Sequence, residues 1–341
     1  MLKPSHIIVI RLSAMGDVAM TVPVLRAFTK QYPNIKVTVL TRGFFAPFFE
    51  DIPNVTVYIA DVKGKHKGVL GLWKLSKALK TLQIDAIADL HNVLRSKILK
   101  TFLFGIKTTQ IDKGRAEKKA LVLGESFQQL KTTYQRYADV FKNLGFPVDL
   151  SNPEFPERRQ LSEASKKLLG QDHLQWIGVA PFAAHESKMY PLGMMQQVVK
   201  TLSKTYKVIL FGSQAEAEIL ESWCDNKNLV NLAGRLLFKE ELDVISNLDV
   251  MLSMDSGNAH LAAMLGIKTV TIWGVTHPYA GFAPFNQPED YCLLADRNQY
   301  PKIPTSVYGD KLPEGYENAA GSIPVERVVD KVQVVISSEA R

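Results

Sequence analysis

Near its start the chain reads IIVIRLSAMGDV, residues 7–18. The four apolar residues Ile7 to Ile10 are typical of a short buried strand, and they are too few for the core of a signal peptide. A polar loop follows the strand, and Pro23 then stands in the first turn of a helical pattern, where its fixed φ is tolerated. A strand, a loop and a helix in this order predict a βα unit at the start of the chain.

The same alternation of strands and helices continues along both halves of the sequence. In the first half we expect strands at 7–12, 36–41, 55–60, 84–90 and 108–112, and helices near 21–31, 69–82, 93–104 and 126–144. In the second half we expect strands at 176–180, 207–212, 228–232, 249–254 and 268–273, and helices near 191–204, 214–225, 238–247 and 257–265. Helices of this length between strands are typical of parallel sheets, so the predicted fold class is α/β with two doubly wound sheets.

The length of 341 residues and one proline-rich stretch indicate two domains. Residues 146–156 are polar and contain three prolines, which is typical of a linker between domains. We therefore expect one domain over 1–150 and a second over 151–321, in which 283–321 is mostly loop. An amphipathic pattern in 322–341 predicts a C-terminal helix that packs back on the first domain.

Composition and charge exclude several classes of protein. Hydrophobic residues make up 46% and the 21 Gly and 17 Pro follow no period, so a disordered or collagen-like chain is excluded. Two distant cysteines exclude a cysteine zinc site, and no stretch approaches the ~18 apolar residues that span a bilayer. The prediction is a soluble cytoplasmic protein that can touch a membrane surface. We expect no metal ion.

The charge is divided unevenly between the two halves. Lys and Arg total 41 and Asp and Glu total 34, a net charge of +7. Residues 1–150 hold 23 basic and 11 acidic residues, a net +12, which leaves 18 and 23, a net −5, for 151–341. This asymmetry indicates that the halves face different molecules, and the basic half suits a polyanion.

In open α/β sheets ligands bind at the carboxyl ends of the strands, so the loops after the strands are the places to search. The first of these loops contains Ser13, Met15, Gly16 and Asp17. It holds one glycine, not the three of the dinucleotide fingerprint. Asp17 stands at a strand-to-helix turn, where a general base and a helix cap are equally good interpretations.

A second loop reads DSGNAH, residues 255–260, and follows an apolar strand. Ser256 can cap the following helix, and Gly257 lets a ligand approach its backbone N–H groups. A helix N-terminus favours a phosphate by about 0.3–1 kcal/mol from its dipole alone. With Asn258 and His260 in the first turn, a diphosphate site is favoured over an ordinary cap beside a surface histidine.

Two more loops hold single charged residues. Lys188 follows the strand 176–180, and Glu216 follows Gly212 after the strand 207–212. Alone, Lys188 would be a solvated surface residue and Glu216 a first-turn helix acid. Lys188 is a stronger candidate for a functional residue because it shares a sheet edge with Asp255. Glu216 is placed where a carboxylate can accept hydrogen bonds from ribose hydroxyls.

Taken together, these segments resemble the ADP-heptose:lipopolysaccharide heptosyltransferase family, which has the two-Rossmann-domain GT-B fold. The matching segments extend over nearly the whole chain in the right order: RLSAMGD at 11–17, KMYP at 188–191, NLAGR at 231–235, DSGNAHLAA at 255–263 and WGVTHP at 273–278. The motifs at 11–17 and 255–263 are specific together and weak singly.

The resemblance implies a role for each candidate residue. Asp17 would be the general base that removes the proton of the acceptor hydroxyl, in an acceptor and phosphate loop with Ser13, Met15 and Gly16. Lys188 would neutralise charge on the departing ADP. The remaining donor-binding residues would be Asp255 on the sugar, Ser256, Gly257, Asn258 and His260 on the diphosphate, Gly212 and Glu216 at the ribose and Leu236 beside the base.

The implied reaction is metal-independent transfer of heptose, with inversion, from ADP-heptose to the lipopolysaccharide inner core. Inversion needs one base and a stabilised leaving group, which suits this division of residues. The implied partners are the nucleotide sugar and an anionic glycolipid at the inner membrane surface, without a cofactor or nucleic acid. The sequence departs from the family at Ala183, Ala184 and Tyr190, so another nucleotide sugar or acceptor stays open. A non-catalytic binder of anionic glycolipid or nucleic acid is less favoured.

Overall fold

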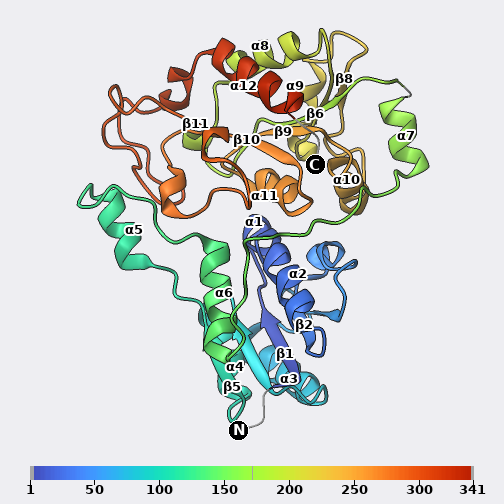
Figure 1. The fold of residues 1–341 in the computed structure, drawn as a ribbon, viewed down its shortest axis with the longest axis vertical. Helices are drawn as coiled ribbons and strands as arrows, with labels where there is room; N and C mark the ends of the chain where they lie inside the picture. The colour runs from blue at the N-terminus through green and yellow to red at the C-terminus, as the bar shows by residue number, and fades with distance from the viewer. Residues whose placement is uncertain (1–3, 171, 339–341) are drawn as a thin grey trace. The chain divides into compact units, whose positions relative to one another are not determined.

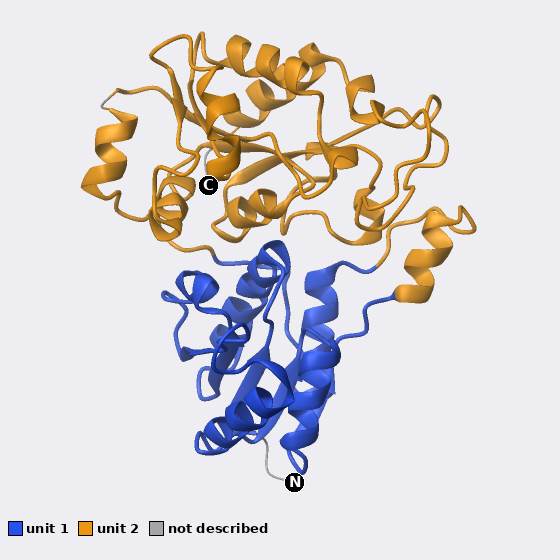
Figure 2. Ribbon diagram, turned by 180° about the vertical axis from the view of Figure 1, so that it is seen from behind, with its two compact units in different colours: residues 1–114, 131–154 blue, residues 115–130, 155–341 orange. Residues whose placement is uncertain are grey.

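The computed structural model describes residues 4–170 and 172–338. Its chain forms two compact units: unit 1 contains residues 1–114 and 131–154, and unit 2 contains residues 115–130 and 155–341 (Figure 2). Each unit is built on one parallel sheet with helices packed against it, so the predicted α/β class with two doubly wound sheets is confirmed.

Unit 1 has a five-stranded sheet in the order β3-β2-β1-β4-β5. Its strands are β1 (His6–Ile10), β2 (Lys36–Thr41), β3 (Val55–Ile59), β4 (Ala86–Asp89) and β5 (Lys107–Gln110). All five residues of the central strand β1 are buried, as its apolar run predicts. The chain builds outward from β1 to β3 and then returns to place β4 on the other side of β1, so the β1/β4 boundary is the switch point of the sheet.

Four helices of unit 1 pack in two pairs. The helices of this unit are α1 (Met15–Ala19), α2 (Thr21–Gln31), α3 (Gly68–Lys80), α4 (Leu94–Phe102) and α6 (Thr133–Leu144), with a 3₁₀ helix η1 (Gly43–Phe48). In one pair α3 lies against α4, and Leu75 and Leu99 join a core cluster with Ile8 and Ile10 of β1. In the other, α2 lies against α6, with the rings of Phe28 and Phe141 4.6 Å apart between centroids.

Unit 2 has a six-stranded sheet in the order β11-β10-β9-β6-β7-β8. Its strands are β6 (Trp176–Ala180), β7 (Lys207–Leu210), β8 (Leu229–Asn231), β9 (Val250–Met254), β10 (Lys268–Trp273) and β11 (Cys292–Leu294). The chain builds from β6 to β8 and then returns to place β9 beside β6, so the switch point lies between β6 and β9.

The helices of unit 2 come from two parts of the chain, 115–122 and 163–337. They are α5 (Arg115–Val122), α7 (Glu163–Leu169), α8 (Leu192–Leu202), α9 (Ala217–Glu221), α10 (Phe238–Ile245), α11 (Gly257–Met264) and α12 (Val325–Ser337), with 3₁₀ helices η2 (Glu186–Lys188), η3 (Gln214–Glu216), η4 (Pro278–Ala280), η5 (Glu289–Tyr291) and η6 (Ala319–Ser322). The amphipathic pattern correctly placed α12. It packs against α8, β9 and β10 of unit 2, because Val328 and Val332 fill the core of this unit (Figure 1). Packing of this helix on the first domain stays a prediction.

The range 1–150 expected for the first domain is interrupted by residues 115–130, which belong to unit 2 (Figure 2). Leu121 and Leu130 form a small core cluster with Ala280, and the Leu130 N–H donates to the Tyr279 carbonyl at 2.9 Å. The guanidinium of Arg297 lies 3.5 Å from the centroid of the Phe127 ring. These contacts explain why the helix expected at 126–144 starts only at Thr133: its first residues pack on unit 2 instead.

The range 283–321 is mostly loop, as expected, and contains one short strand, β11, at an edge of the sheet. Among the described residues, no helix is both long and apolar enough to cross a bilayer.

Candidate functional site

The centre of the candidate site in unit 2 is an ion pair between Lys188 and Asp255. Lys188 ends η2 after β6, and Asp255 directly follows β9, so the two residues come from the strands on either side of the switch point. Lys188 Nζ lies 2.8 Å from Asp255 Oδ2, and the side chains are only 13% and 9% exposed. The structure therefore joins these two predicted residues in one nearly buried pair. Lys188 is no solvated surface residue.

A third strand fixes the carboxylate of Asp255. Thr276, which follows β10, donates its hydroxyl to Asp255 Oδ2 at 2.8 Å, and the Asp255 N–H donates to the Ile272 carbonyl at 3.0 Å. Thr276 is buried. Thr276 lies within the motif at 273–278, but its role was not predicted, because its contact with Asp255 depends on the pairing of β9 with β10.

Two glycines make room for Lys188. A Cβ atom on Gly309 would lie 2.5 Å from both Cγ and Cδ of Lys188, and the Gly309 φ of +82° is in the left-handed region that favours glycine. The Ser187 hydroxyl donates to the Gly309 carbonyl at 2.5 Å, which ties this loop to η2. A Cβ on Gly274 would lie 2.5 Å from the Ser187 carbonyl oxygen and 3.4 Å from Lys188 Cα. The stem of Lys188 is therefore positioned by close backbone contact, which the sequence analysis missed.

The helix α11 begins beside this pair without a side-chain cap. Ser256 occupies the N-cap position, but its hydroxyl makes no capping bond and lies 3.0 Å from the Ser253 hydroxyl instead. The expectation that Ser256 caps the helix is therefore wrong. The backbone N–H groups of Gly257 and Asn258 lie in the first turn of α11, and N–H groups at the start of a helix attract anions. His260, one turn in, is 7% exposed, so it is not a surface histidine.

Gly212, Glu216 and Leu236 lie around β7 and β8. The Glu216 carboxylate accepts a hydrogen bond from the Ser213 N–H at 2.6 Å, as expected of an acidic residue in the first turn of a helix. A Cβ on Gly212 would lie 3.1 Å from Glu216 Oε2, so the glycine allows the carboxylate to sit against the end of β7. Leu236 is half-buried in the turn before α10.

In unit 1 the candidate residues gather at the carboxyl end of β1. Asp17 lies in α1, where Oδ2 forms an ion pair with Arg11 and accepts the Ala14 N–H at 3.3 Å. The Asp17 side chain is 28% exposed, whereas that of Arg11 is 7% exposed and donates to the Leu90 carbonyl at 2.7 Å. Asp17 therefore caps its helix and is also held by a buried arginine. Ser13 is half-buried in the loop before α1, and Met15 and Gly16 are half-buried in the first turn of α1.

A histidine that the sequence analysis missed lies next to this loop. His91 follows β4, the strand beside β1, and its Nε2 lies 3.5 Å from the Ser13 hydroxyl. The N–H groups of His91 and Asn92 donate to Asp89 Oδ1, and Lys100 Nζ lies 2.7 Å from Asp89 Oδ2. Burial and the charge of Arg11 lower the pKa of His91 to about 4, so its ring is neutral at pH 7. The sequence feature that could have identified His91 as a candidate is its position directly after a predicted strand.

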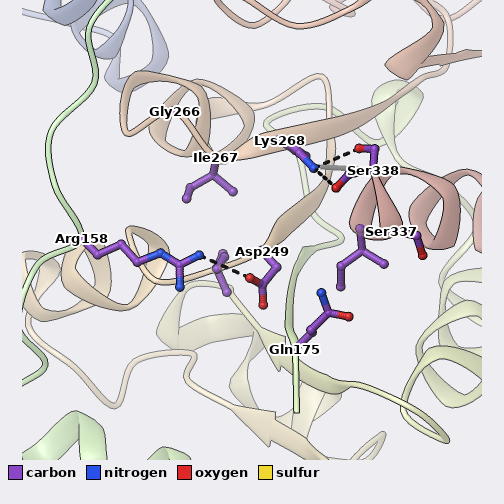
Figure 3. A pocket seen from close by; sticks show the side chains of 10 residues that line it. Arg158, Gln175, Asp249, Gly266, Ile267, Lys268, Ser337 and Ser338 are labelled. Carbon is purple, nitrogen blue, oxygen red and sulfur yellow. Dashed lines mark hydrogen bonds and ion pairs between the residues drawn. The ribbon is translucent and has the colours of Figure 1, made fainter. Parts of the chain in front are cut away.

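The hollow in Figure 3 lies at the opposite edge of the unit 2 sheet. It has a volume of about 460 Å³ and is lined by residues at the amino ends of β6, β9 and β10, among them Asp249 and Lys268. Arg158 pairs with Asp249 at 3.3 Å, and Lys268 Nζ donates to the Ser338 carbonyl at 2.8 Å. The Lys268 contact holds the C-terminal end of α12. Within 4–170 and 172–338, no group of three or more His, Cys, Asp or Glu side chains is arranged to hold a metal ion.

Comparisons with known proteins agree with the motifs. The family model for glycosyltransferase family 9 (heptosyltransferase) matches residues 72–310. The lipopolysaccharide core heptosyltransferase OpsX of Haemophilus influenzae is 25% identical over 315 residues, which cover 86% of each chain.

Solved structures share the fold. A family 9 glycosyl transferase from Veillonella parvula matches with a TM-score of 0.78 and 19% identity over 98% of both chains. The E. coli heptosyltransferase WaaC with ADP-2-deoxy-2-fluoro heptose matches with a TM-score of 0.67 and 18% identity, over 96% of this chain and 99% of that one. These neighbours show two parallel-sheet domains of the GT-B type. The family match covers most of the chain, and the chain therefore belongs to glycosyltransferase family 9, the heptosyltransferases, and is a glycosyltransferase.

Proposed function

We propose that this protein transfers heptose from ADP-heptose to the inner core of lipopolysaccharide, with inversion and without a metal ion. The observation that carries the proposal is the nearly buried Lys188–Asp255 pair at the switch point of unit 2, beside the uncapped start of α11. A cation and a helix N-terminus together are suited to a nucleoside diphosphate. The donor sugar is supported by the relatives, one of which was solved with an analogue of ADP-heptose.

In this proposal Lys188 stabilises the leaving ADP. A lysine ammonium has three N–H donors, and the contact with Asp255 Oδ2 engages one of them, so the others can reach a phosphate oxygen. Asp255, oriented by Thr276, hydrogen-bonds the transferred sugar. Ser256, Gly257, Asn258 and His260 hold the diphosphate at the start of α11. A positioned cation of this kind stabilises charge that develops as the bond to the leaving group breaks.

Glu216, Gly212 and Leu236 serve the nucleoside in the same proposal. The Glu216 carboxylate has two oxygens, and Oε2 accepts the Ser213 N–H, so Oε1 is the atom assigned to the ribose hydroxyls. Leu236, half-buried in the turn before α10, flanks the base.

Asp17 is the proposed general base. Inverting displacement needs one carboxylate to take the proton of the acceptor hydroxyl while that hydroxyl attacks the anomeric carbon. The ion pair with Arg11 and the Ala14 N–H fix one carboxylate oxygen, Oδ2, which leaves Oδ1 to accept the proton. Ser13 in the preceding loop and Met15 and Gly16 in the first turn of α1, all half-buried, line the acceptor side.

The acceptor is proposed to be an anionic glycolipid at the inner surface of the membrane. Lipopolysaccharide core is phosphorylated, and the net charge of +12 over residues 1–150 is complementary to it. A second candidate keeps the fold and uses another nucleotide sugar or acceptor, because this chain has alanines at 183 and 184, where the family resemblance implies hydroxyl residues near the phosphates.

The experiment is an ADP-release assay with ADP-heptose and heptose-free lipopolysaccharide, run with and without EDTA. We expect turnover in both, no turnover for Asp17→Ala with nucleotide binding retained, and weaker ADP binding and slower turnover for Lys188→Ala. Full turnover by Asp17→Ala, or loss of turnover in EDTA, would contradict the corresponding part of the proposal. A larger thermal shift with a UDP- or GDP-sugar would favour the second candidate.

A further inference from the structure

Large apolar side chains are exposed around the carboxyl edge of the unit 1 sheet. Phe44 follows β2 and is 50% exposed, and Ile59 ends β3 and is 54% exposed. Val69 and Leu70 begin α3 and are 56% and 77% exposed, and Leu94 begins α4 and is 74% exposed. Single exposed apolar residues are ordinary, but five on successive connections at one edge of a sheet mark an interaction site.

The helix α3 is amphipathic in an unusual way. Its buried side consists of Leu72, Leu75 and Leu79, which join the core of unit 1. Its outer side carries Leu70, then Trp73, which is 42% exposed, and then Lys77, whose Nζ lies 3.8 Å from the centroid of the Trp73 ring. Apolar and aromatic residues beside lysines on an exposed helix face are typical of helices that lie in a membrane interface.

Basic residues surround these apolar side chains. Between positions 61 and 100 the sequence holds nine basic residues, Lys63, Lys65, Lys67, Lys74, Lys77, Lys80, Arg95, Lys97 and Lys100, against three acidic ones, Asp61, Asp85 and Asp89. Asp89 is fully buried against Lys100, and Asp85 lies at the amino edge of the sheet, where it accepts bonds from Ser5 and His6.

Asp61 is the one exposed acidic residue of this segment at the carboxyl edge, because Asp89, which ends β4, is buried. Its carboxylate accepts the N–H groups of Gly64 and Lys65. Because one carboxylate stands among many lysines, the field at this edge is positive.

We propose that this surface, which we name the α3–α4 face (Phe44, Ile59, Val69, Leu70, Trp73, Leu94 and the lysines at 63, 65, 67, 74 and 77), docks on an anionic lipid bilayer. The charge selects an anionic partner. Four of the six exposed apolar side chains are aliphatic (Ile59, Val69, Leu70 and Leu94), which favours a bilayer over a nucleic acid, since a nucleic-acid groove relies on aromatics that stack on the bases. The inference rests on the proposed glycolipid acceptor, because the loop that holds Asp17 follows β1 at the same edge. Docking would bring that loop to the headgroups.

The test is co-flotation of the full chain with vesicles of phosphatidylglycerol and, separately, of phosphatidylcholine. We expect binding to phosphatidylglycerol that weakens with salt, and little binding to phosphatidylcholine. The double variant Leu70→Glu/Leu94→Glu should bind at least about tenfold more weakly, and replacing Lys63, Lys65 and Lys67 by Gln should cost about fivefold per lysine. The matched control is Phe104→Glu, which changes a residue that is 84% exposed at the opposite end of α4 and should leave binding unchanged.

Transfer to a soluble, deacylated acceptor separates docking from catalysis. The double variant should retain wild-type turnover with that acceptor, which also shows that it is folded. Vesicle binding without any heptosyl transfer would support the docking surface and would overturn the proposed function. Equal vesicle binding by the double variant and the wild type would overturn the docking surface. Two other results would also overturn the docking surface. One is self-association of the wild type in sedimentation velocity that the double variant loses while the control variant keeps it. The other is RNA binding by the wild type that is lost in the same way.

Discussion

Substituting Gly309 by Ala tests whether the loop at 306–310 positions Lys188. The new Cβ would lie 2.5 Å from Cγ and Cδ of Lys188, about 1 Å closer than ordinary contact, so the lysine stem must move. A misplacement of about 1 Å at a reacting group costs roughly 100-fold, or about 2.7 kcal/mol of transition-state stabilisation. The Lys188–Asp255 distance of 2.8 Å would lengthen by a similar amount.

A matched control separates this effect from backbone strain. Gly315 lies in the same long segment with a φ of +80°, close to the +82° of Gly309, but a Cβ there would meet nothing within 4 Å. Both alanine variants should lose about 1–2 kcal/mol of folding stability from the left-handed backbone. Only Gly309→Ala should lower kcat/KM for ADP-heptose, by about 100-fold, in the ADP-release assay. Equal kcat/KM for the two folded variants would refute the reasoning.

Three further outcomes are expected. Asp17→Asn should lower kcat by about 10²–10⁴-fold and leave the KM for the donor unchanged, because Asp17 lies in unit 1; a raised donor KM in steady-state kinetics would contradict this. Thr276→Val should lower the unfolding free energy and transition-state stabilisation by about 1.5–3 kcal/mol each, because it removes a buried hydrogen bond to a carboxylate, and unchanged urea melts and kcat/KM would argue against that role. The pKa of His91 is about 4 when folded and about 6.5 when unfolded, so its contribution to stability is full above pH 6.5 and is lost as the pH falls toward 4. At pH 5 the loss is about 2 kcal/mol, so His91→Asn should be less sensitive to acid than the wild type in urea melts at pH 7.5 and 5, and equal sensitivity would contradict the assignment.

The sequence was informative where the structure is local. The apolar run 7–10 and the strands before Lys188 and Asp255 were predicted from hydrophobic patterning, because a buried parallel strand needs an apolar run. The rule that ligands lie at carboxyl ends then placed both residues at one edge of a sheet. Their direct contact follows from β6 and β9 being neighbours, which needs the sheet order as well.

Features that depend on distant contacts were missed. The segment 115–130 was assigned to the first domain by its position in the chain, but Leu121 and Leu130 are buried against Ala280. The strand β11 has three residues, too few for a periodic signal. Gly309 lies in a stretch rich in Pro and Gly, and its approach to Lys188, 121 positions earlier, cannot be derived from spacing.

Transfer of heptose is the central claim, and the mass of the acceptor after reaction tests it most directly. The wild-type protein is incubated with ADP-heptose and heptose-free lipopolysaccharide, and the acceptor is analysed by mass spectrometry alongside measurement of released ADP. The proposal predicts that the acceptor gains the mass of one heptose for each ADP released. An unchanged acceptor mass, or ADP release matched only by free heptose, would contradict it.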